Sequence, residues 1–422
     1  MVAKIFASPS ELAGLWRSNR RRFIHEALLI YLALGFVISP PALWSDVYYA
    51  LLFPITVHFV WRNPTLYFRQ MSAPMLIGSV LIAWFTITLL WDSTALTNGS
   101  SLHWVWSALC TFVYIHSLAD ALQTQTDFRY RLMRGLILAG MVNATIAFVR
   151  LPFFVDKMWG ANGVLRMAGW SVTRHAILGA IIIGLIVIMA IDRALVRNDR
   201  GFWIAALVGL VFIALTGSRG PEIAVSSAII VLLGWSRPRL LGLLVLVVML
   251  AVSLFAFLDW SLLYHLIEEQ LARGDSHRFI IWRLSWHDIM QHPWLGHGPE
   301  YRLDRPGEAF PHNLFLSTWL YTGLVGLGLL AAYLLRVLQG ALASPNRAER
   351  AFNIAILVLL LLSAMTDYSQ IIKGPGPMWY MFWLPTLLVA CRVLRKNKML
   401  SVQQPSLLEP INYIPPADAD AN

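Results

Sequence analysis

The sequence predicts an all-α, polytopic membrane protein with about twelve transmembrane helices and a long outer loop that contains short helices. Three observations support this fold class. Of the 422 residues, 58% are hydrophobic and only 13% are charged, well below the charged share of ordinary soluble domains. The apolar stretches recur at the length of roughly 20 residues that a helix needs to cross a bilayer. Barrel strands would instead read as short alternating segments, so helices are the expected spanning elements.

The predicted spans follow one another closely up to residue 259, and a long segment then precedes the tenth. They cover residues 27–42, 45–61, 73–91, 102–119, 133–151, 175–192, 202–216, 222–236, 240–259, 314–339, 352–371 and 376–394. The opening residues have a late positive cluster and no small-residue cleavage site, so we expect the first span to be retained. Cys110 and Cys391 lie inside or beside spans and predict neither a disulfide framework nor a cysteine metal site.

The distribution of basic residues predicts that both termini are cytoplasmic. Clusters such as 20–22 fall on one side of the spans, whereas the opposite loops "WSD" and "DSTALTNGSS" contain no basic residue. We therefore assign the net charge of +10 to this bias and expect no nucleic-acid partner. The chain divides into a cytoplasmic segment at 1–26, an integral membrane domain at 27–398 with its outer loop at 260–313, and a Pro-rich, disordered cytoplasmic tail at 399–422.

Some basic residues fall on the outer side, where they are least expected. They are Arg150, Lys157, Arg166, Arg174, Arg219, Arg273, Arg278, Arg283, Arg302, Arg305 and Lys373. Arg219 lies in the tight turn "LTGSRGPE" near bilayer depth, where a guanidinium is costly unless it meets an anion, a polar cavity or a partner such as Glu222. Several arginine-bearing loops predict a cationic pocket suited to phosphate oxygens, although Arg273, Arg302 and Arg305 could equally be solvated surface.

The outer loop at 260–313 predicts two short helices and an irregular return. "LLYHLIEEQL" has helical periodicity, and "HRFIIWRLSWHDIM" places Phe279, Trp282, Trp286 and Ile289 at helical spacing, as expected of an amphipathic helix on the membrane or the bundle. "QHPWLGHGPEYRLDRPGEAFPH" is broken by Pro and Gly. Six of the 11 histidines lie in this loop, but no HExxH or HxH spacing appears, so a metal site is not expected.

His312 differs from the other histidines because the tenth span begins just after it. Asn313 stands near the N-cap position of that helix, which holds the imidazole at the boundary between water and membrane. An imidazole beside several arginines is a candidate general base, since nearby cations lower its pKa and keep it neutral. A capping or packing role is the alternative.

The motif set "LTGSRG", "SHRFIIW", "HPWLGHG" and "PHNLFLSTWLYTGLVGLGLL" resembles the O-antigen ligase and polymerase superfamily. The length and helix count are most similar to O-antigen ligase of Gram-negative inner membranes. The resemblance implies transfer of O-antigen glycan from undecaprenyl diphosphate to a sugar hydroxyl of lipid A-core, at a periplasmic site. It also implies inversion at the anomeric centre and no cofactor, neither metal nor nucleotide.

Carried over residue by residue, the resemblance implies a catalytic role for three positions of this chain. They are His312 in "PHN", Arg219 in "GSRG" and Arg278 in "SHRFIIW". It implies substrate binding by Arg166 in "LRMAGW"; Arg174, Asn313 and Trp282 complete the candidate substrate-binding set. The family often has an Asn-Pro pair where this chain reads "TRHA", so the pattern departs at Arg174 and His175.

Two other functions remain open from the sequence. An O-antigen polymerase or a protein O-oligosaccharyltransferase would use the same donor class with a different acceptor. A secondary transporter would show duplicated halves and midplane polar residues, whereas polarity here lies in the outer loops. For Asp92, Asp367, Tyr368 and Lys373, near the outer span ends, we expect interfacial anchoring in preference to a place in the site.

Overall fold

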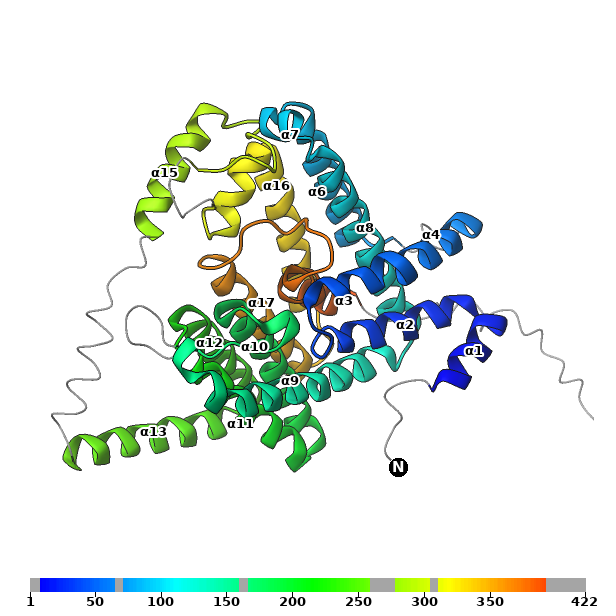
Figure 1. Cartoon of the computed structure of the whole chain (residues 1–422). Helices are drawn as coiled ribbons and strands as arrows, with labels where there is room; N and C mark the ends of the chain where they lie inside the picture. Colours follow the sequence, from blue (N-terminus) through cyan, green and yellow to red (C-terminus); the bar gives the residue numbers. More distant parts are fainter. Residues whose placement is uncertain (1–7, 65–70, 159–165, 259–277, 304–309, 392–422) are drawn as a thin grey trace, which may run out of the picture.

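The protein is a bundle of helices. The computed structural model describes residues 8–64, 71–158, 166–258, 278–303 and 310–391, and every regular element in these ranges is helical (Figure 1). Six described helices are long and apolar enough to cross a membrane: Pro41–Arg62, Ala73–Leu90, Ser101–Thr124, Phe128–Phe153, Ala176–Arg197 and Leu314–Leu342. The prediction of an all-α, polytopic membrane protein is confirmed.

A helix occupies each predicted span. The helices are α1 (Pro9–Ser18), α2 (Arg20–Leu34), α3 (Pro41–Val47), η1 (Tyr48–Leu52), α4 (Phe53–Arg62), α6 (Ala73–Ile87), η2 (Thr88–Leu90), α7 (Ser93–Asn98), α8 (Ser101–Thr124), α9 (Phe128–Met158), η3 (Ser171–Thr173), α10 (Ala176–Arg197), α11 (Arg200–Leu215), α12 (Arg219–Ser236), α13 (Pro238–Leu258), α15 (Arg278–Gln291), α16 (Leu314–Leu342), α17 (Arg347–Ala364), η4 (Trp379–Trp383) and α18 (Leu384–Ala390). The helix predicted at "LLYHLIEEQL" and the tail at 399–422 lie outside the described residues.

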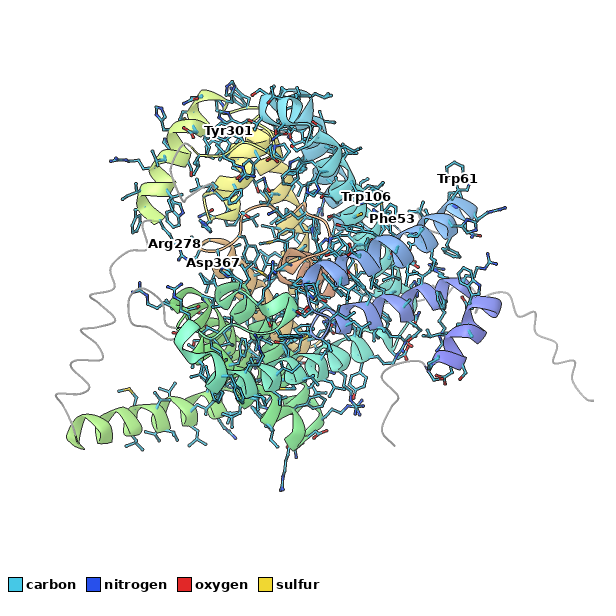
Figure 2. All side chains as sticks on the ribbon, in the orientation of Figure 1. Phe53, Trp61, Trp106, Arg278, Tyr301 and Asp367 are labelled. Atoms are coloured by element: carbon cyan, nitrogen blue, oxygen red, sulfur yellow. The ribbon has the colours of Figure 1, made fainter. Side chains whose placement is uncertain are left out.

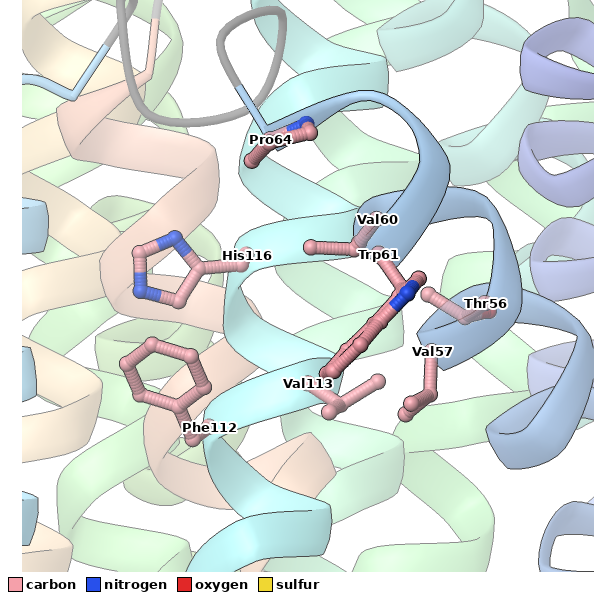
Figure 3. A pocket seen from close by; sticks show the side chains of 8 residues that line it. All are labelled: Thr56, Val57, Val60, Trp61, Pro64, Phe112, Val113 and His116. Atoms are coloured by element: carbon pink, nitrogen blue, oxygen red, sulfur yellow. The ribbon is translucent and has the colours of Figure 1, made fainter.

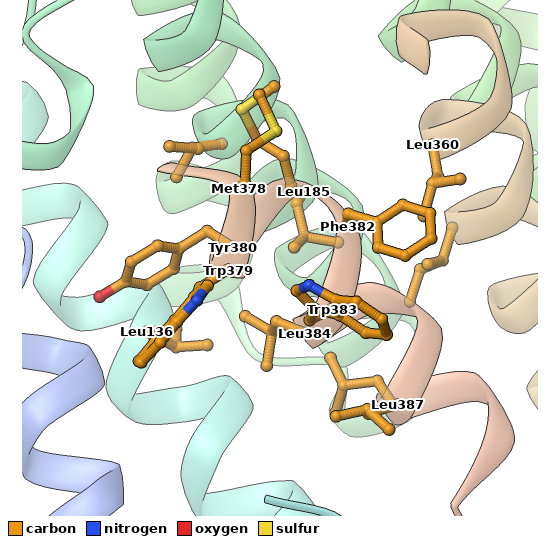
Figure 4. Close-up of a cluster of buried hydrophobic side chains, with 14 of the residues drawn as sticks. Leu136, Leu185, Leu360, Met378, Trp379, Tyr380, Phe382, Trp383, Leu384 and Leu387 are labelled. Carbon is orange, nitrogen blue, oxygen red and sulfur yellow. The ribbon is translucent and has the colours of Figure 1, made fainter. Parts of the chain in front are cut away.

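An aromatic core surrounds η4 and α18. Trp379 stacks on Tyr114 of α8 with ring centroids 4.0 Å apart, and both side chains are buried. The Tyr380 hydroxyl donates to Leu32 O of α2 at 2.6 Å, and the Tyr333 hydroxyl of α16 lies 2.8 Å from Thr386 Oγ1. Figure 4 shows part of this cluster, in which the last helices of the chain are enclosed by earlier ones. In hydrocarbon a polar group needs an internal partner, and these bonds provide one for the Tyr380 and Tyr333 hydroxyls.

α16 is broken at Gly323, and the segment 292–298 fills the break. Gly323 has φ 66° and ψ −172°, a backbone conformation that favours glycine. The N–H groups of His297 and Gly298 donate to the carbonyls of Leu320 and Tyr321 at 2.8 and 2.9 Å, and Leu324 N donates to Pro293 O at 2.9 Å. The motif "HPWLGHG" thus satisfies backbone groups that the helix itself leaves open.

α15 occupies the range predicted for the amphipathic helix, and its faces differ in exposure. Ile281, Ser285 and Ile289 are buried, whereas Phe279 and Trp286 are 67% and 49% exposed. Four-residue spacing places the three buried side chains on one face. α15 packs on α16, and Ile281 and Ile289 share a buried cluster with Leu320 and Tyr321. Contact with α16, which the sequence pattern does not encode, therefore selected the buried face.

A pocket of about 420 Å³ opens between α4 and α8 (Figure 3). Its lining is mostly apolar: Thr56, Val57, Val60, Trp61, Pro64, Phe112, Val113 and His116. The His116 Nε2 lies 2.9 Å from Ser79 Oγ of α6, so the imidazole is hydrogen-bonded to the protein. None of the candidate site residues lines this pocket, and it is separate from the chemistry described next.

Candidate active site

Three helices begin and one ends at the same place in the bundle. His175 is the N-cap of α10, Arg219 opens α12 and Asn313 caps α16, while Asp367 follows the end of α17. A Cβ added to Gly220 would stand 3.1 Å from Asp367 Oδ2, so the first turn of α12 lies against Asp367. Helix N-termini carry partial positive charge, and this arrangement favours an anion.

Asp367 is the centre of this region. Arg278 Nη2, at the start of α15, donates to Asp367 Oδ1 at 2.7 Å, and Thr366 Oγ1 donates to Oδ2 at 2.6 Å. Figure 2 shows Arg278 and Asp367 side by side between α15 and the helices α10 and α12. The Asp367 side chain is 3% exposed, so it is an internal group and not the interfacial anchor expected from the sequence.

His312 and His175 lie in the same region, because both interact electrostatically with Asp367. Burial raises the pKa of Asp367, and the Arg278 charge, the hydrogen bond from Thr366 and the imidazoles of His312 and His175 oppose that rise. Partial burial lowers the pKa of His175, the Asp367 carboxylate opposes this, and the neighbouring side chains of Arg166, His312 and Arg174 lower it further. These groups therefore lie within electrostatic reach of one another.

We call this group the cationic cluster. It consists of Arg166, Arg174, His175, Arg219, Arg278 and His312 around Asp367. Arg166, Arg174 and Arg219 are exposed, so their guanidinium groups are accessible to a ligand. All three arginine-bearing regions identified from the sequence, 166–174, 219 and 278, are thus brought together.

The loop that carries Arg166 and Arg174 is fixed to its surroundings. Met167 N donates to Leu215 O at 3.0 Å, at the end of α11, and the Trp170 indole N–H donates to Val37 O at 2.9 Å. Asn143 of α9 accepts from Thr173 Oγ1 at 2.6 Å. The backbone of this loop is therefore held at both ends, which limits the entropy lost when its arginines bind a ligand.

His312 is held from both sides in an unusual conformation. Its φ is 51°, in the left-handed region that non-glycine residues rarely adopt. Before it, the Trp282 indole N–H donates to Pro311 O at 3.1 Å. After it, Asn313 Oδ1 accepts from Phe315 N and Leu316 N at 3.0 and 3.1 Å, and its Nδ2 donates to Met365 O at 3.0 Å.

Trp282 and Asn313 were both predicted to bind substrate. In the structure their polar groups form hydrogen bonds with the protein backbone. The single N–H of the indole is used on Pro311, and the Asn313 carboxamide joins the start of α16 to the end of α17. A strained residue persists only where its surroundings determine it, and these bonds do so for His312.

Sequence reasoning did not place Asp367 or His175 in the site. The sequence did contain one indication for Asp367, namely its position at the end of an apolar run. A carboxylate there has a high free energy unless a cationic partner is present. That partner, Arg278, is 89 residues away in the chain, so the sequence could not identify it. His175 follows Arg174 directly, and only the fold shows that it faces Asp367.

The arrangement combines several guanidinium groups, three helix N-termini, a buried carboxylate and an imidazole whose backbone is fixed on both sides. Arginines and helix N-termini stabilise charge that develops on phosphate oxygens. An imidazole accepts a proton near neutral pH. Together these groups suit the displacement of a phosphate leaving group by a hydroxyl.

Comparisons with known proteins agree with this chemistry. The family model described as O-antigen ligase matches residues 204–331, a segment that contains Arg219, Arg278 and His312. The chain is also 26% identical over 362 residues to an O-antigen ligase of Pseudomonas aeruginosa. That match covers 82% of this chain and 84% of the relative.

Proposed function

We propose that this chain, which is similar to O-antigen ligases over the matches given above, is a glycosyltransferase that transfers O-antigen glycan from undecaprenyl diphosphate to a sugar hydroxyl of lipid A-core. The observation that carries this proposal is the cationic cluster, in which several arginines and His312 lie in one region around Asp367. No metal or nucleotide enters the proposed reaction.

Four arginines hold the donor diphosphate. Arg219, Arg166 and Arg174 are exposed, and Arg278 reaches the region from α15. Guanidinium forks match pairs of phosphate oxygens, and their charge stabilises the pair of electrons that the leaving group acquires. Asp367 keeps the Arg278 side chain in place when the site is empty, because the ion pair at 2.7 Å is buried on the carboxylate side.

His312 accepts the proton of the acceptor hydroxyl. The hydroxyl oxygen forms a bond to the anomeric carbon while the bond from that carbon to the diphosphate oxygen breaks, and its electron pair leaves with the diphosphate. Attack from the face opposite the leaving group inverts the anomeric centre. Trp282 and Asn313 act as positioning residues, since each fixes the backbone beside His312.

The membrane topology is part of the proposal. Each predicted span coincides with a helix, and we infer twelve spans across the Gram-negative inner membrane, with both termini cytoplasmic and the cationic cluster facing the periplasm. α10, α12 and α16 begin at the cluster and α17 ends there, as alternation across a bilayer requires. The parts at 1–26, 27–398 and 399–422 are inferred to be the cytoplasmic segment, the membrane transferase domain and the cytoplasmic tail.

Reconstitution tests the function directly. Purified protein in proteoliposomes is given undecaprenyl-diphosphate glycan with either lipid A-core or a second donor molecule, and the products are separated by size. Transfer to lipid A-core is the expected result. Elongation of the second donor molecule alone would instead identify a polymerase, and glycan on an added acceptor protein would identify a protein O-oligosaccharyltransferase. No transfer to any of the three acceptors would contradict the proposal.

A further inference from the structure

A second group of charged and aromatic residues lies beside His312 but outside the cationic cluster. The guanidinium carbon of Arg302 and the ammonium nitrogen of Lys373 each lie 5.7 Å from the ring centroid of Phe310. The Arg302 side chain is 60% exposed and Lys373 is also exposed. Two cations therefore meet one half-buried aromatic ring at a surface that a ligand can reach.

Hydrogen bonds to α8 and its surroundings fix the backbone on both sides of this group. Next to Arg302, Glu300 Oε2 accepts from the Trp104 indole N–H at 2.6 Å, and Glu300 N donates to the buried Asp92 at 2.7 Å. The Lys373 carbonyl accepts from Thr111 Oγ1 at 2.7 Å and from the Trp379 indole at 3.0 Å. The two cations thus project from positions held by the bundle.

The charge balance of this group favours an anion. Two like charges that share one ring repel each other, and an anion between them removes the repulsion. Glu300 is an anionic neighbour of both cations, but its contact with Arg302 is 3.3 Å long and mostly exposed on the arginine side, where ion pairs contribute little. A phosphate or carboxylate with good geometry can compete with such a pair.

The position of the group relative to His312 indicates what it binds. Phe310 stands two residues before His312 in the chain, so the group and the proposed base belong to one short segment. In an inverting displacement the attacking hydroxyl and the leaving diphosphate occupy opposite faces of the anomeric carbon. With the diphosphate assigned to the cationic cluster, the acceptor needs its own contacts near His312, and the group around Phe310 can provide them.

We propose that Phe310, Arg302 and Lys373 form an acceptor subsite that binds an anionic sugar, phosphorylated or carboxylated, next to the hydroxyl that is glycosylated. The ring packs against the sugar face, and the two cations contact its anionic group. This inference rests on the proposed function, because it uses the assignment of the donor to the cationic cluster.

The test uses the double variant Arg302→Gln/Lys373→Gln in proteoliposomes with purified donor and acceptor. We expect the KM for the acceptor to rise roughly tenfold for each cation removed, with the donor KM and the kcat at saturating acceptor unchanged. The matched control is Arg239→Gln, an exposed arginine at the start of α13, which should leave both KM values unchanged.

Modified acceptors separate the two anion sources. If phosphate is recognised, phosphatase treatment of the acceptor raises its KM for the wild type and has no further effect in the double variant. If carboxylate is recognised, reduction of the acceptor's carboxyl groups raises its KM for the wild type and has no further effect in the double variant. A rise in the donor KM, or an unchanged acceptor KM in the double variant, overturns the proposal.

A binding measurement distinguishes failure of the subsite from failure of the proposed function. Delipidated core oligosaccharide, intact or stripped of its anionic groups, is titrated onto the protein in nanodiscs. Weaker binding to the double variant than to Arg239→Gln supports the subsite even if no glycan is transferred. Equal binding to both variants contradicts the subsite even if transfer proceeds.

Discussion

The two ends of α8 lie beside different groups of charged residues. At the end, the Asp120 carboxylate accepts from the Arg21 guanidinium and lies 2.8 Å from His25 Nε2. At the start, Trp104 binds Glu300 beside the proposed acceptor subsite. Sixteen residues of helix separate Trp104 from Asp120, about 24 Å at ~1.5 Å per residue.

The Asp120 end is a matched, buried network. Arg131 pairs with the carboxylate of Glu26 at 2.5 Å and with Asp127 at 2.8 Å, and His25 and Glu26 are each 2% exposed. The cationic cluster instead gathers four arginines and two histidines around Asp367, and three of those arginines are exposed. Matched buried charges join α2, α8 and α9, whereas an excess of accessible positive charge indicates a binding site.

The largest effect is expected at His312. His312→Ala removes the proposed base and should reduce glycan transfer by about 10²–10⁴-fold, the range for loss of a general acid-base group. The reconstituted transfer assay measures this. Membrane insertion should match the wild type, because neither the Arg278–Asp367 ion pair nor the Asp120 network is altered. Transfer at the wild-type rate would remove His312 from the mechanism.

The Asp120 network should respond to substitution in stability and not in turnover. Asp120→Asn leaves Arg21 and His25 without their carboxylate in a buried place, which costs about 3–5 kcal/mol of unfolding free energy. A thermal shift assay in detergent measures the lower melting temperature. The kcat per folded molecule should stay near that of the wild type. A selective loss of kcat in a stable protein would contradict the structural role.

A lysine substitution in the cationic cluster and another in the Asp120 network sharpen the contrast. Arg219→Lys keeps the charge but loses the forked contact with phosphate, and we expect transfer to fall by about tenfold or more. Arg21→Lys makes the same chemical change in the Asp120 network and should lower the melting temperature with little change in kcat. The transfer and thermal shift assays together check both. A lower melting temperature for Arg219→Lys together with lost transfer for Arg21→Lys would contradict the roles assigned to the two regions.

The smallest effect concerns pH and His175. Its pKa is lowered in the folded protein, by partial burial first and then by the cations around it. The unfolded chain therefore binds a proton at His175 at higher pH than the folded protein, so acidification through about pH 6.5 favours unfolding. Asn suits the N-cap position that His175 occupies, so His175→Asn should preserve α10. Its melting temperature should fall less than that of the wild type between about pH 7 and pH 5.5, and an equal fall would show that His175 contributes nothing.

The spanning helices could be predicted because the length and polarity of a segment report directly on whether it crosses a bilayer. The break in α16 could not, since the groups that stabilise it come from residues 293–298. For the same reason the sequence pattern of α15 did not show which side chains face the bundle, because contact with α16 decides which of them are buried. His312, Arg219 and Arg278 were identified as candidates from the sequence. Trp282 and Asn313 instead form hydrogen bonds with backbone carbonyls, and the positioning role proposed for them could be inferred only from the fold.

The sequence by itself determined that this chain is an all-helical membrane protein and which of its arginines and histidines stand at helix ends, because both follow from local composition. Only the tertiary structure decided that Arg278 meets Asp367, that the charges at one end of the bundle are matched and buried, and that those at the other face outward in excess. Charge partners far apart in the chain are chosen by helix packing, and no local pattern records that choice.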